Sequence, residues 1–122
     1  MKLRIKGNSV RIRLTKPEVS KLAEIGYLEE QTLFGDNSFL YALQSIPGEG
    51  QLTATFTDNK VTMFVPSSLL KDWPNNNVVG FNSAMLITET DSLYLLLEKD
   101  FVCLDETTED QSDNYSNPKL NC

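Results

Sequence analysis

The sequence predicts an α+β fold that is mostly antiparallel β, arranged as a single sheet or a partly closed barrel. Short segments in which apolar and polar residues alternate recur along the first 104 residues, as they do in half-buried strands. Two-residue turns at Gly7-Asn8 and Asp58-Asn59 are typical of β-hairpins. Helix signals are confined to one segment in the N-terminal half and a shorter one later in the chain.

Basic and apolar residues alternate along segment 2–14, which puts successive side chains on opposite faces of a strand. One face carries five cations, which we call the basic stripe: Lys2, Arg4, Lys6, Arg11 and Arg13. If Gly7-Asn8 turns a hairpin, Arg4 faces Arg11, and Lys2 faces Arg13 in the same register. Each like-charge pair costs a few tenths to ~1 kcal/mol, so we expect carboxylates or a bound anion opposite them. A long strand with a bulge at Gly7 is the alternative.

The clearest helix is expected over residues 16–25. Thr15-Lys16-Pro17-Glu18 is a capping-box pattern with proline in the first turn. The apolar residues that follow share one helical face, and Gly26 suits the C-terminal cap.

The remaining chain to residue 104 is expected to be mostly β. The expected strands cover residues 27–34, 38–44, 51–57, 60–65, 78–81, 85–88 and 92–98. Across the Asp58-Asn59 turn, the expected pairs are Leu52 with Val65, Ala54 with Met63, and Phe56 with Val61. A short helix is expected to start at Pro66-Ser67, run through Trp73 and end at Pro74. Segment 93–97 is apolar on both faces, which predicts a central position in the sheet.

The composition changes at Asp105, which divides the chain into a domain of residues 1–104 and an acidic tail of residues 105–122. The tail is expected to be flexible, or docked only through Tyr115 and Leu120. Cys103 is expected to be a small buried apolar residue, and Cys122 to pair with it only under oxidising conditions.

Composition excludes several classes of function. The 122 residues carry a net charge of −6 and no histidine. There is therefore no Ser-His-Asp or Cys-His nucleophile, and no zinc site that needs imidazole. The acidic balance argues against nucleic acid as a partner. No apolar run approaches the ~20 residues of a membrane span, and no signal-peptide pattern opens the chain. We therefore expect no membrane association and a cytoplasmic location.

The basic stripe is the main candidate site. Seven of the eleven Lys and Arg residues lie in the first 21 positions. Arg binds phosphate oxygens through two parallel hydrogen bonds and Lys binds them as a point charge. The stripe thus predicts binding of a phosphorylated anion or of an acidic protein surface. The simpler interpretation is a solvent-exposed face, because alternating Lys and Arg also protect edge strands from aggregation.

Four carboxylates form a second candidate set: Glu89, Asp91, Glu98 and Asp100. If Thr90-Asp91 turns a hairpin, these acids approach one end of a sheet and could hold Mg²⁺ with water. The favoured interpretation is that they are turn and strand-end residues exposed to water. Because Glu98 and Asp100 follow a fully apolar strand, at least one could be partly buried and paired with a stripe cation.

Strings at both ends of the chain resemble a family of bacterial proteins of about this length that has no established function. The strings are Leu3–Ser9, Arg11–Thr15, Glu98–Phe101, Cys103-Leu104 and Asn114–Cys122. The resemblance covers essentially the whole chain. It implies membership of that family and brings no catalytic residues with it.

The arginine-bearing strands also resemble those of the CYTH triphosphate-tunnel enzymes. In that family, Arg-x-Arg strands line a β-barrel that holds triphosphate and a divalent metal, and segments 3–6 and 11–13 look like such strands. The family's N-terminal Glu-x-Glu-x-Lys motif is absent, and Lys2-x-Arg4-x-Lys6 stands in its place. The chain is also short for an eight-stranded tunnel. The resemblance implies a degenerate relative that keeps anion binding and loses metal-dependent hydrolysis.

Three hypotheses follow, in order of preference. The first is a non-catalytic domain without a cofactor that binds an anionic ligand or acidic partner through the basic stripe. The second is a metal-dependent phosphohydrolase, in which Mg²⁺ is the cofactor and the four carboxylates hold it. The third is a homodimer held together by the basic hairpin and the acidic tail.

Overall fold

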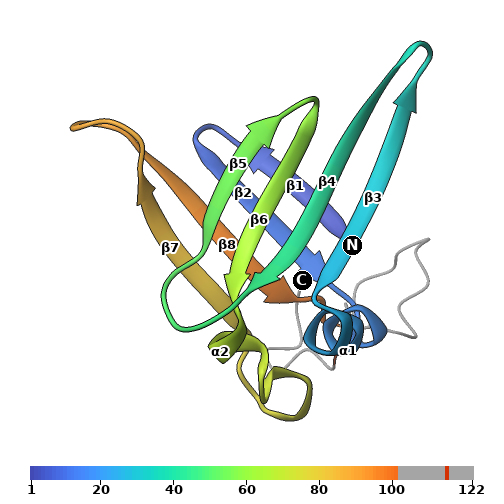
Figure 1. Cartoon of the computed structure of the whole chain (residues 1–122), viewed down its shortest axis with the longest axis vertical. Coiled ribbons are helices and arrows are strands. Elements are labelled where there is room, and N and C mark those ends of the chain that lie inside the picture. Colours follow the sequence, from blue (N-terminus) through green and yellow to red (C-terminus); the bar gives the residue numbers. More distant parts are fainter. Residues whose placement is uncertain (102–114, 116–122) are drawn as a thin grey trace.

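The computed structural model describes residues 1–101 and residue 115. The strands of this part of the chain form two four-stranded sheets, and the helices lie at one end of both sheets (Figure 1). The α+β, mostly antiparallel class is confirmed. The sheets, however, are two and separate, and no barrel closes among the described residues, so neither the single sheet nor the partly closed barrel forms.

The first sheet has the strand order β1-β2-β8-β7. Its strands are β1 (Lys2–Lys6), β2 (Ser9–Leu14), β8 (Ser92–Lys99) and β7 (Gly80–Leu86). Two antiparallel hairpins form its halves, and they meet through parallel pairing of β2 with β8. Segment 93–97 lies in β8 and is therefore central, as predicted.

The second sheet repeats this topology with the strand order β3-β4-β6-β5. Its strands are β3 (Tyr27–Phe34), β4 (Asn37–Ile46), β6 (Lys60–Pro66) and β5 (Thr53–Thr57). Again two antiparallel hairpins meet through a parallel central pair, here β4 with β6. Local alternation could not predict these parallel pairs, because each joins strands that are distant in sequence.

The first hairpin has the predicted register. Arg4 pairs with Arg11, and Lys2 pairs with Arg13. Gly7 has a φ of +54°, in the left-handed region that glycine adopts without steric cost. The chain therefore turns at Gly7-Asn8, and the alternative of one long bulged strand is wrong.

The helix α1 (Lys16–Ile25) matches the prediction. The Thr15 amide and hydroxyl groups donate hydrogen bonds of 2.9 and 3.1 Å to Glu18 Oε1, as expected for the capping box. At the other end, the Gly26 amide donates to the Leu22 carbonyl, and Gly26 has a φ of +86°.

Some boundaries in the second half differ from the prediction. The expected strands 78–81 and 85–88 are one strand, β7, because residues 80–86 all pair with β8 without a break. The pairs Ala54–Met63 and Phe56–Val61 form, but β5 begins at Thr53, so the expected pairing of Leu52 with Val65 is absent.

The short second helix also differs from the prediction. The helix α2 (Ser67–Leu70) ends before Trp73, which lies in a separate 3₁₀ turn, η1 (Trp73–Asn75). Pro74 is inside this turn rather than just after a helix. Proline has no N–H and a fixed φ near −65°, which suits the start of a tight turn.

The core lies between the two sheets and against the helices. In Figure 1 the second sheet lies in front of the first, and the strands of the two sheets cross. The fully buried side chains include Ile12, Leu14, Val19, Leu22, Leu43, Met63, Trp73, Leu95 and Leu97. Because this apolar layer occupies the inward face of the first sheet, the basic stripe must lie on its outward face.

Cys103, Leu120, Cys122 and the rest of the predicted tail lie outside the described residues, with the exception of Tyr115. The Tyr115 ring is partly buried, and its centroid lies 5.9 Å from that of Phe101. Tyr115 therefore contacts the end of the domain, as expected for a docking residue of the tail. The domain boundary at residue 104 stays a prediction.

Candidate functional site

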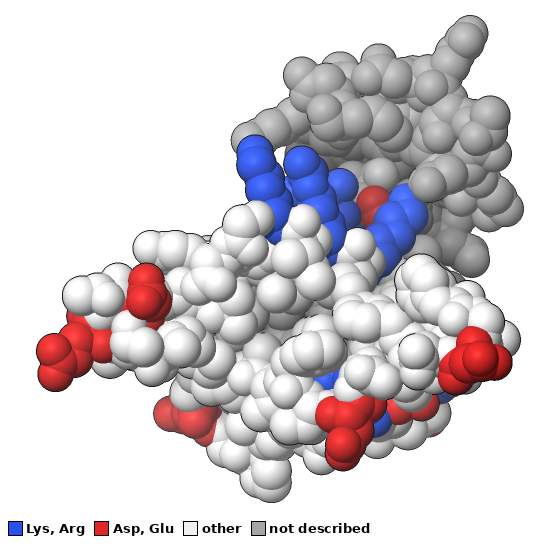
Figure 2. Space-filling model, turned by 90° about the horizontal axis from the view of Figure 1, so that it is seen from above, with Lys and Arg blue, Asp and Glu red and all other residues white. Residues whose placement is uncertain are grey.

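The basic stripe lies on the outward face of the first sheet. Along β2, Val10, Ile12 and Leu14 are buried, while Arg11 and Arg13 alternate with them on the more exposed face. Figure 2 shows Lys and Arg side chains gathered in one group toward the top of the view. The alternation in the sequence thus brings the cations together on one surface.

The stripe lines a groove of about 320 Å³. The lining residues are Lys2, Leu3, Arg4, Arg11 and Arg13. Directly opposed residues of an antiparallel pair have Cβ atoms roughly 4.5–5.5 Å apart, so Arg4 and Arg11 are close neighbours. Lys6 pairs with Ser9 near the turn and does not line the groove. Four of the five predicted residues therefore share one concave surface.

Two carboxylates lie beside the stripe, as the like-charge pairs predict. Arg11 Nε lies 3.0 Å from Glu98 Oε1, and Arg13 Nε lies 4.0 Å from the same oxygen. Lys2 Nζ lies 3.1 Å from Asp100 Oδ2. Asp100 is buried and Glu98 is partly buried. The expectation of a partly buried acid paired with a stripe cation is confirmed for both residues.

These ion pairs leave hydrogen-bonding capacity unused. Glu98 Oε1 and Asp100 Oδ2 are buried, and neither receives a well-aligned hydrogen bond from the described residues. The contacts are therefore charge attractions at short range rather than aligned hydrogen bonds. The two guanidinium groups keep N–H donors that a further acceptor could use.

Positive charge is in excess across the stripe. Its five cations face the two carboxylates Glu98 and Asp100, which leaves three positive charges unmatched among the described residues. Arg4 and Lys6 form no ion pair within the part of the chain that the structure describes. Arg4 thus lines the groove without an ion-pair partner among residues 1–101 and 115.

The four predicted metal ligands are not brought together. Glu89 and Asp91 are exposed at the turn before β8, where Asp91 Oδ2 accepts a hydrogen bond of 3.1 Å from Thr88. Glu98 and Asp100 lie at the opposite end of β8, roughly 20 Å away at 3.3 Å per residue. No group of three metal-binding side chains forms among the described residues. The interpretation of Glu89 and Asp91 as exposed turn residues is confirmed.

Sequence reasoning missed a second pocket, which contains Lys99. This pocket has a volume of about 340 Å³ and is lined by Lys16, Asn76, Asn77, Val79, Lys99, Phe101 and Tyr115. Lys99 is only 3% exposed. The signal was available, because Lys99 continues the inward series Leu93, Leu95 and Leu97 of β8 by strict alternation.

The N-terminal ammonium forms a further charged cluster, near the start of α1. It contacts Glu18 Oε2 and lies 3.6 Å from Glu30 Oε1. Burial of Glu18 opposes its ionisation, but hydrogen bonds from the ammonium and from the Thr15 amide outweigh burial and lower the pKa of Glu18. This cluster ties the first sheet to the helix and to the second sheet.

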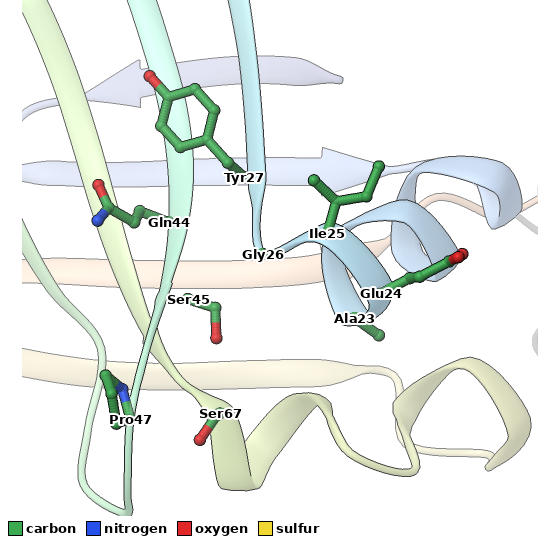
Figure 3. A pocket seen from close by; sticks show the side chains of 9 residues that line it. All are labelled: Ala23, Glu24, Ile25, Gly26, Tyr27, Gln44, Ser45, Pro47 and Ser67. Atoms are coloured by element: carbon green, nitrogen blue, oxygen red, sulfur yellow. The ribbon is translucent and has the colours of Figure 1, made fainter.

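A further pocket of about 530 Å³ lies where α1 meets the second sheet (Figure 3). Its lining includes Tyr27, Gln44, Ser45 and Ser67, and its charged residue is Glu24, whose carboxylate points away from Ser45 in Figure 3. Ser67 already accepts a hydrogen bond of 3.1 Å from the Gly48 amide. This open, largely neutral pocket offers no convergent charge comparable to the stripe.

Among the described residues, no helix has the length and apolar character needed to cross a membrane. Comparison with curated proteins and with solved structures gives no match, so the resemblance to the CYTH enzymes gains no support. The family described as "Family of unknown function (DUF7009)" matches residues 1–119. This match confirms the resemblance carried by the strings at both ends of the chain. The chain therefore belongs to this family of unknown function.

Proposed function

We propose that the protein binds a small phosphorylated anion in the groove of the basic stripe, without catalysing its hydrolysis. The single observation that carries this proposal is that two cross-strand pairs of cations line one groove. In these pairs Arg4 lies opposite Arg11, and Lys2 lies opposite Arg13. Like charges in such positions destabilise the hairpin unless anions compensate them. Within the part of the chain that the structure describes, two carboxylates compensate part of this charge, and Arg4 forms no ion pair.

The chemistry of these side chains favours phosphate over other anions. A guanidinium offers a planar fork of donors that matches two phosphate oxygens, and charge-assisted hydrogen bonds of this type are short and strong. Arg4, Arg11 and Arg13 present three such forks within one groove. A ligand with two or three linked phosphoryl groups has enough oxygens to engage several of them at once.

Binding is favoured over hydrolysis by the placement of the acids. Glu98 and Asp100 lie in ion pairs with stripe cations, and Glu89 and Asp91 are at the other end of β8. A metal-assisted phosphoryl transfer needs carboxylates that hold the ion next to the phosphate. The described residues offer no such cluster.

The test is thermal unfolding of the protein with pyrophosphate, triphosphate, ATP or sulfate, each with and without Mg²⁺. A ligand at a hundredfold excess over its Kd stabilises the native state by about 2.7 kcal/mol, which raises the Tm of a domain of this size by several degrees. We expect pyrophosphate or triphosphate to raise the Tm more than sulfate does, with or without Mg²⁺.

The decisive comparison uses two double variants of equal charge change. Arg4→Gln/Arg13→Gln removes one cation from each cross-strand pair, and should abolish the Tm shift while leaving the unliganded Tm equal or slightly higher. Lys21→Gln/Lys71→Gln removes two exposed lysines elsewhere and should keep the shift. Equal shifts in both variants would contradict the proposal. No shift at millimolar ligand would also contradict it, and would favour an acidic protein surface as the partner of the stripe.

A further inference from the structure

The pocket that contains Lys99 lies on the other side of the first sheet from the stripe. Lys99 follows Glu98 in β8, so their side chains point to opposite faces. The pocket is built from four parts of the chain: the start of α1 with Lys16, the loop that carries Asn76 and Val79, the end of β8 with Phe101 just after it, and Tyr115. It is therefore independent of the groove described above.

Lys99 is buried without a matching negative charge among residues 1–101 and 115. Its ammonium donates one hydrogen bond of 2.8 Å, to the Asn76 carbonyl. It lies 5.6 Å from the ring centroid of Trp73 and 4.9 Å from that of Tyr115. No carboxylate among the described residues lies within 4 Å of it. An ammonium has three N–H donors, so two remain for another acceptor.

The environment of the Lys99 ammonium is energetically unfavourable for a charged group. A buried charge is costly unless it is paired and hydrogen-bonded, and contact with aromatic faces offsets only part of that cost. Burial accordingly lowers the pKa of Lys99. An anion that entered the pocket would supply the missing charge and accept the unused hydrogen bonds.

We infer that this pocket binds a small organic carboxylate, with its oxygens on the Lys99 ammonium and its apolar part against Val79, Phe101 and Tyr115. The lining has that dual character, since these three residues adjoin two asparagine side chains and two lysines. Lys16, which is exposed, lies over the Tyr115 ring at 5.5 Å and adds a second cation at the mouth. Because Lys16 is exposed at the mouth, Lys99 is the buried cation of the pocket and matches one negative charge, whereas the second charge of a phosphate dianion would be left unmatched.

The fluorescence of Trp73 provides a local measurement. Trp73 is the only tryptophan of the chain and is fully buried beside Lys99. We would titrate the full-length protein with benzoate and, separately, with benzamide, which has nearly the same shape without the charge. The expected result is a saturable change with benzoate, and binding of benzamide at least tenfold weaker.

One variant in the pocket and two controls outside it locate the site. Lys99→Met keeps an unbranched side chain one atom shorter and should weaken benzoate binding at least tenfold, whereas Lys71→Met, at an exposed lysine, should leave it unchanged. Arg4→Gln/Arg13→Gln should also leave it unchanged, which separates this site from the proposed phosphate groove.

The inference would be overturned by no saturable change with benzoate at millimolar concentration, by equal binding of benzamide and benzoate, or by full binding of benzoate to a folded Lys99→Met protein. If Lys99→Met does not fold, the comparison of benzoate with benzamide on the unmodified protein still tests whether the pocket binds a carboxylate. Tighter binding of phosphate than of benzoate at this pocket would also contradict the carboxylate assignment.

Discussion

The two sheets of this protein share one topology and differ in the charge of their outward faces. Each is a pair of hairpins joined by two parallel central strands. On the second sheet, Lys60 is matched by a single acid, Glu29, and by the hydroxyl of Tyr27. On the first sheet, the five cations of the basic stripe meet two acids among the residues that the structure describes. The shared topology directs side chains outward, and the residue types at those positions decide whether the face could bind an anion.

The local pKa values of the second sheet are consistent with a compensated pair. Hydrogen bonds with Lys60 and Tyr27 lower the pKa of Glu29, and hydrogen bonds with Glu29 and Tyr27 raise the pKa of Lys60. Each charge thus stabilises the other within the protein. The excess charge of the stripe has no equivalent partner among the described residues, which leaves it available to a ligand.

Among the changes that compare the two sheets, Gly80→Ala in the first sheet is expected to have the largest effect on stability. A Cβ at Gly80 would lie 2.2 Å from the Leu97 carbonyl oxygen and 2.8 Å from Glu98 Cα. The backbone of β8 would have to move, and we expect a loss of about 2–3 kcal/mol in the free energy of unfolding, measured by urea denaturation.

Gly35→Ala is the matched control in the second sheet. Gly35 lies in the turn between β3 and β4, with a φ of +66° and open space around it. An alanine at this position would be strained only by the left-handed backbone conformation, and we expect a loss of about 1–2 kcal/mol in the free energy of unfolding. A Gly35→Ala protein less stable than Gly80→Ala would show that the tight approach in the first sheet does not exist.

A smaller effect is expected where the two sheets are joined by α1. Glu18→Ala removes both the capping box and the contact with the N-terminal ammonium. We expect a loss of about 1–2 kcal/mol at neutral pH. Because the pKa of Glu18 is lowered in the folded protein, its contribution is present above pH 4.5 and disappears as the pH falls below that value.

The measurement is urea unfolding of the wild type and Glu18→Ala at several pH values between 7 and 3. The two proteins should converge in stability at the acidic end. A constant difference across this range would mean that the ionised carboxylate contributes nothing. Glu18→Gln, which keeps an acceptor for the Thr15 amide, should lose less than Glu18→Ala.

The smallest expected effect concerns Tyr41 on the inward face of the second sheet. Burial, together with the hydrogen bond to Glu30 and its negative charge, raises the pKa of Tyr41 to about 12. The neutral phenol is therefore favoured in the folded protein, and this contribution to stability declines as the pH rises from 10 to about 12. Absorbance of the phenolate should show a step near pH 12, and that step should be missing in Tyr41→Phe.

Local features of the sequence were enough to predict part of this structure. The register of the first hairpin followed from Gly7-Asn8 and strict alternation. The like-charge pairs indicated carboxylates or a bound anion beside them, and carboxylates do lie next to Arg11 and Lys2. The hairpin register depends on residues that are close in sequence. The burial of Glu98 and Asp100 depends on the apolar strand that they follow.

The rest depends on contacts between distant segments. Each sheet is held together by a parallel central pair, β2 with β8 in the first and β4 with β6 in the second. The residues of these strands do not indicate which distant strand each one pairs with. The pairing of β2 with β8 places Glu98 next to Arg13 and leaves Glu89 and Asp91 at the far end of β8. The charge imbalance around Lys99 likewise appears only when the loop at Asn76 and Tyr115 close over it.

The central claim is that unmatched positive charge on the first sheet binds a phosphorylated anion. Isothermal titration of pyrophosphate into the wild type, Glu98→Gln and Arg4→Gln tests this claim most directly, because the variants change the charge of the groove in opposite directions. Glu98→Gln leaves Arg11 and Arg13 free of their acid, and should tighten Kd by about two- to fivefold. Arg4→Gln should weaken Kd by about tenfold or more. Unchanged or weaker binding by Glu98→Gln would contradict the account, since it would show that the acid assists the ligand rather than competes with it.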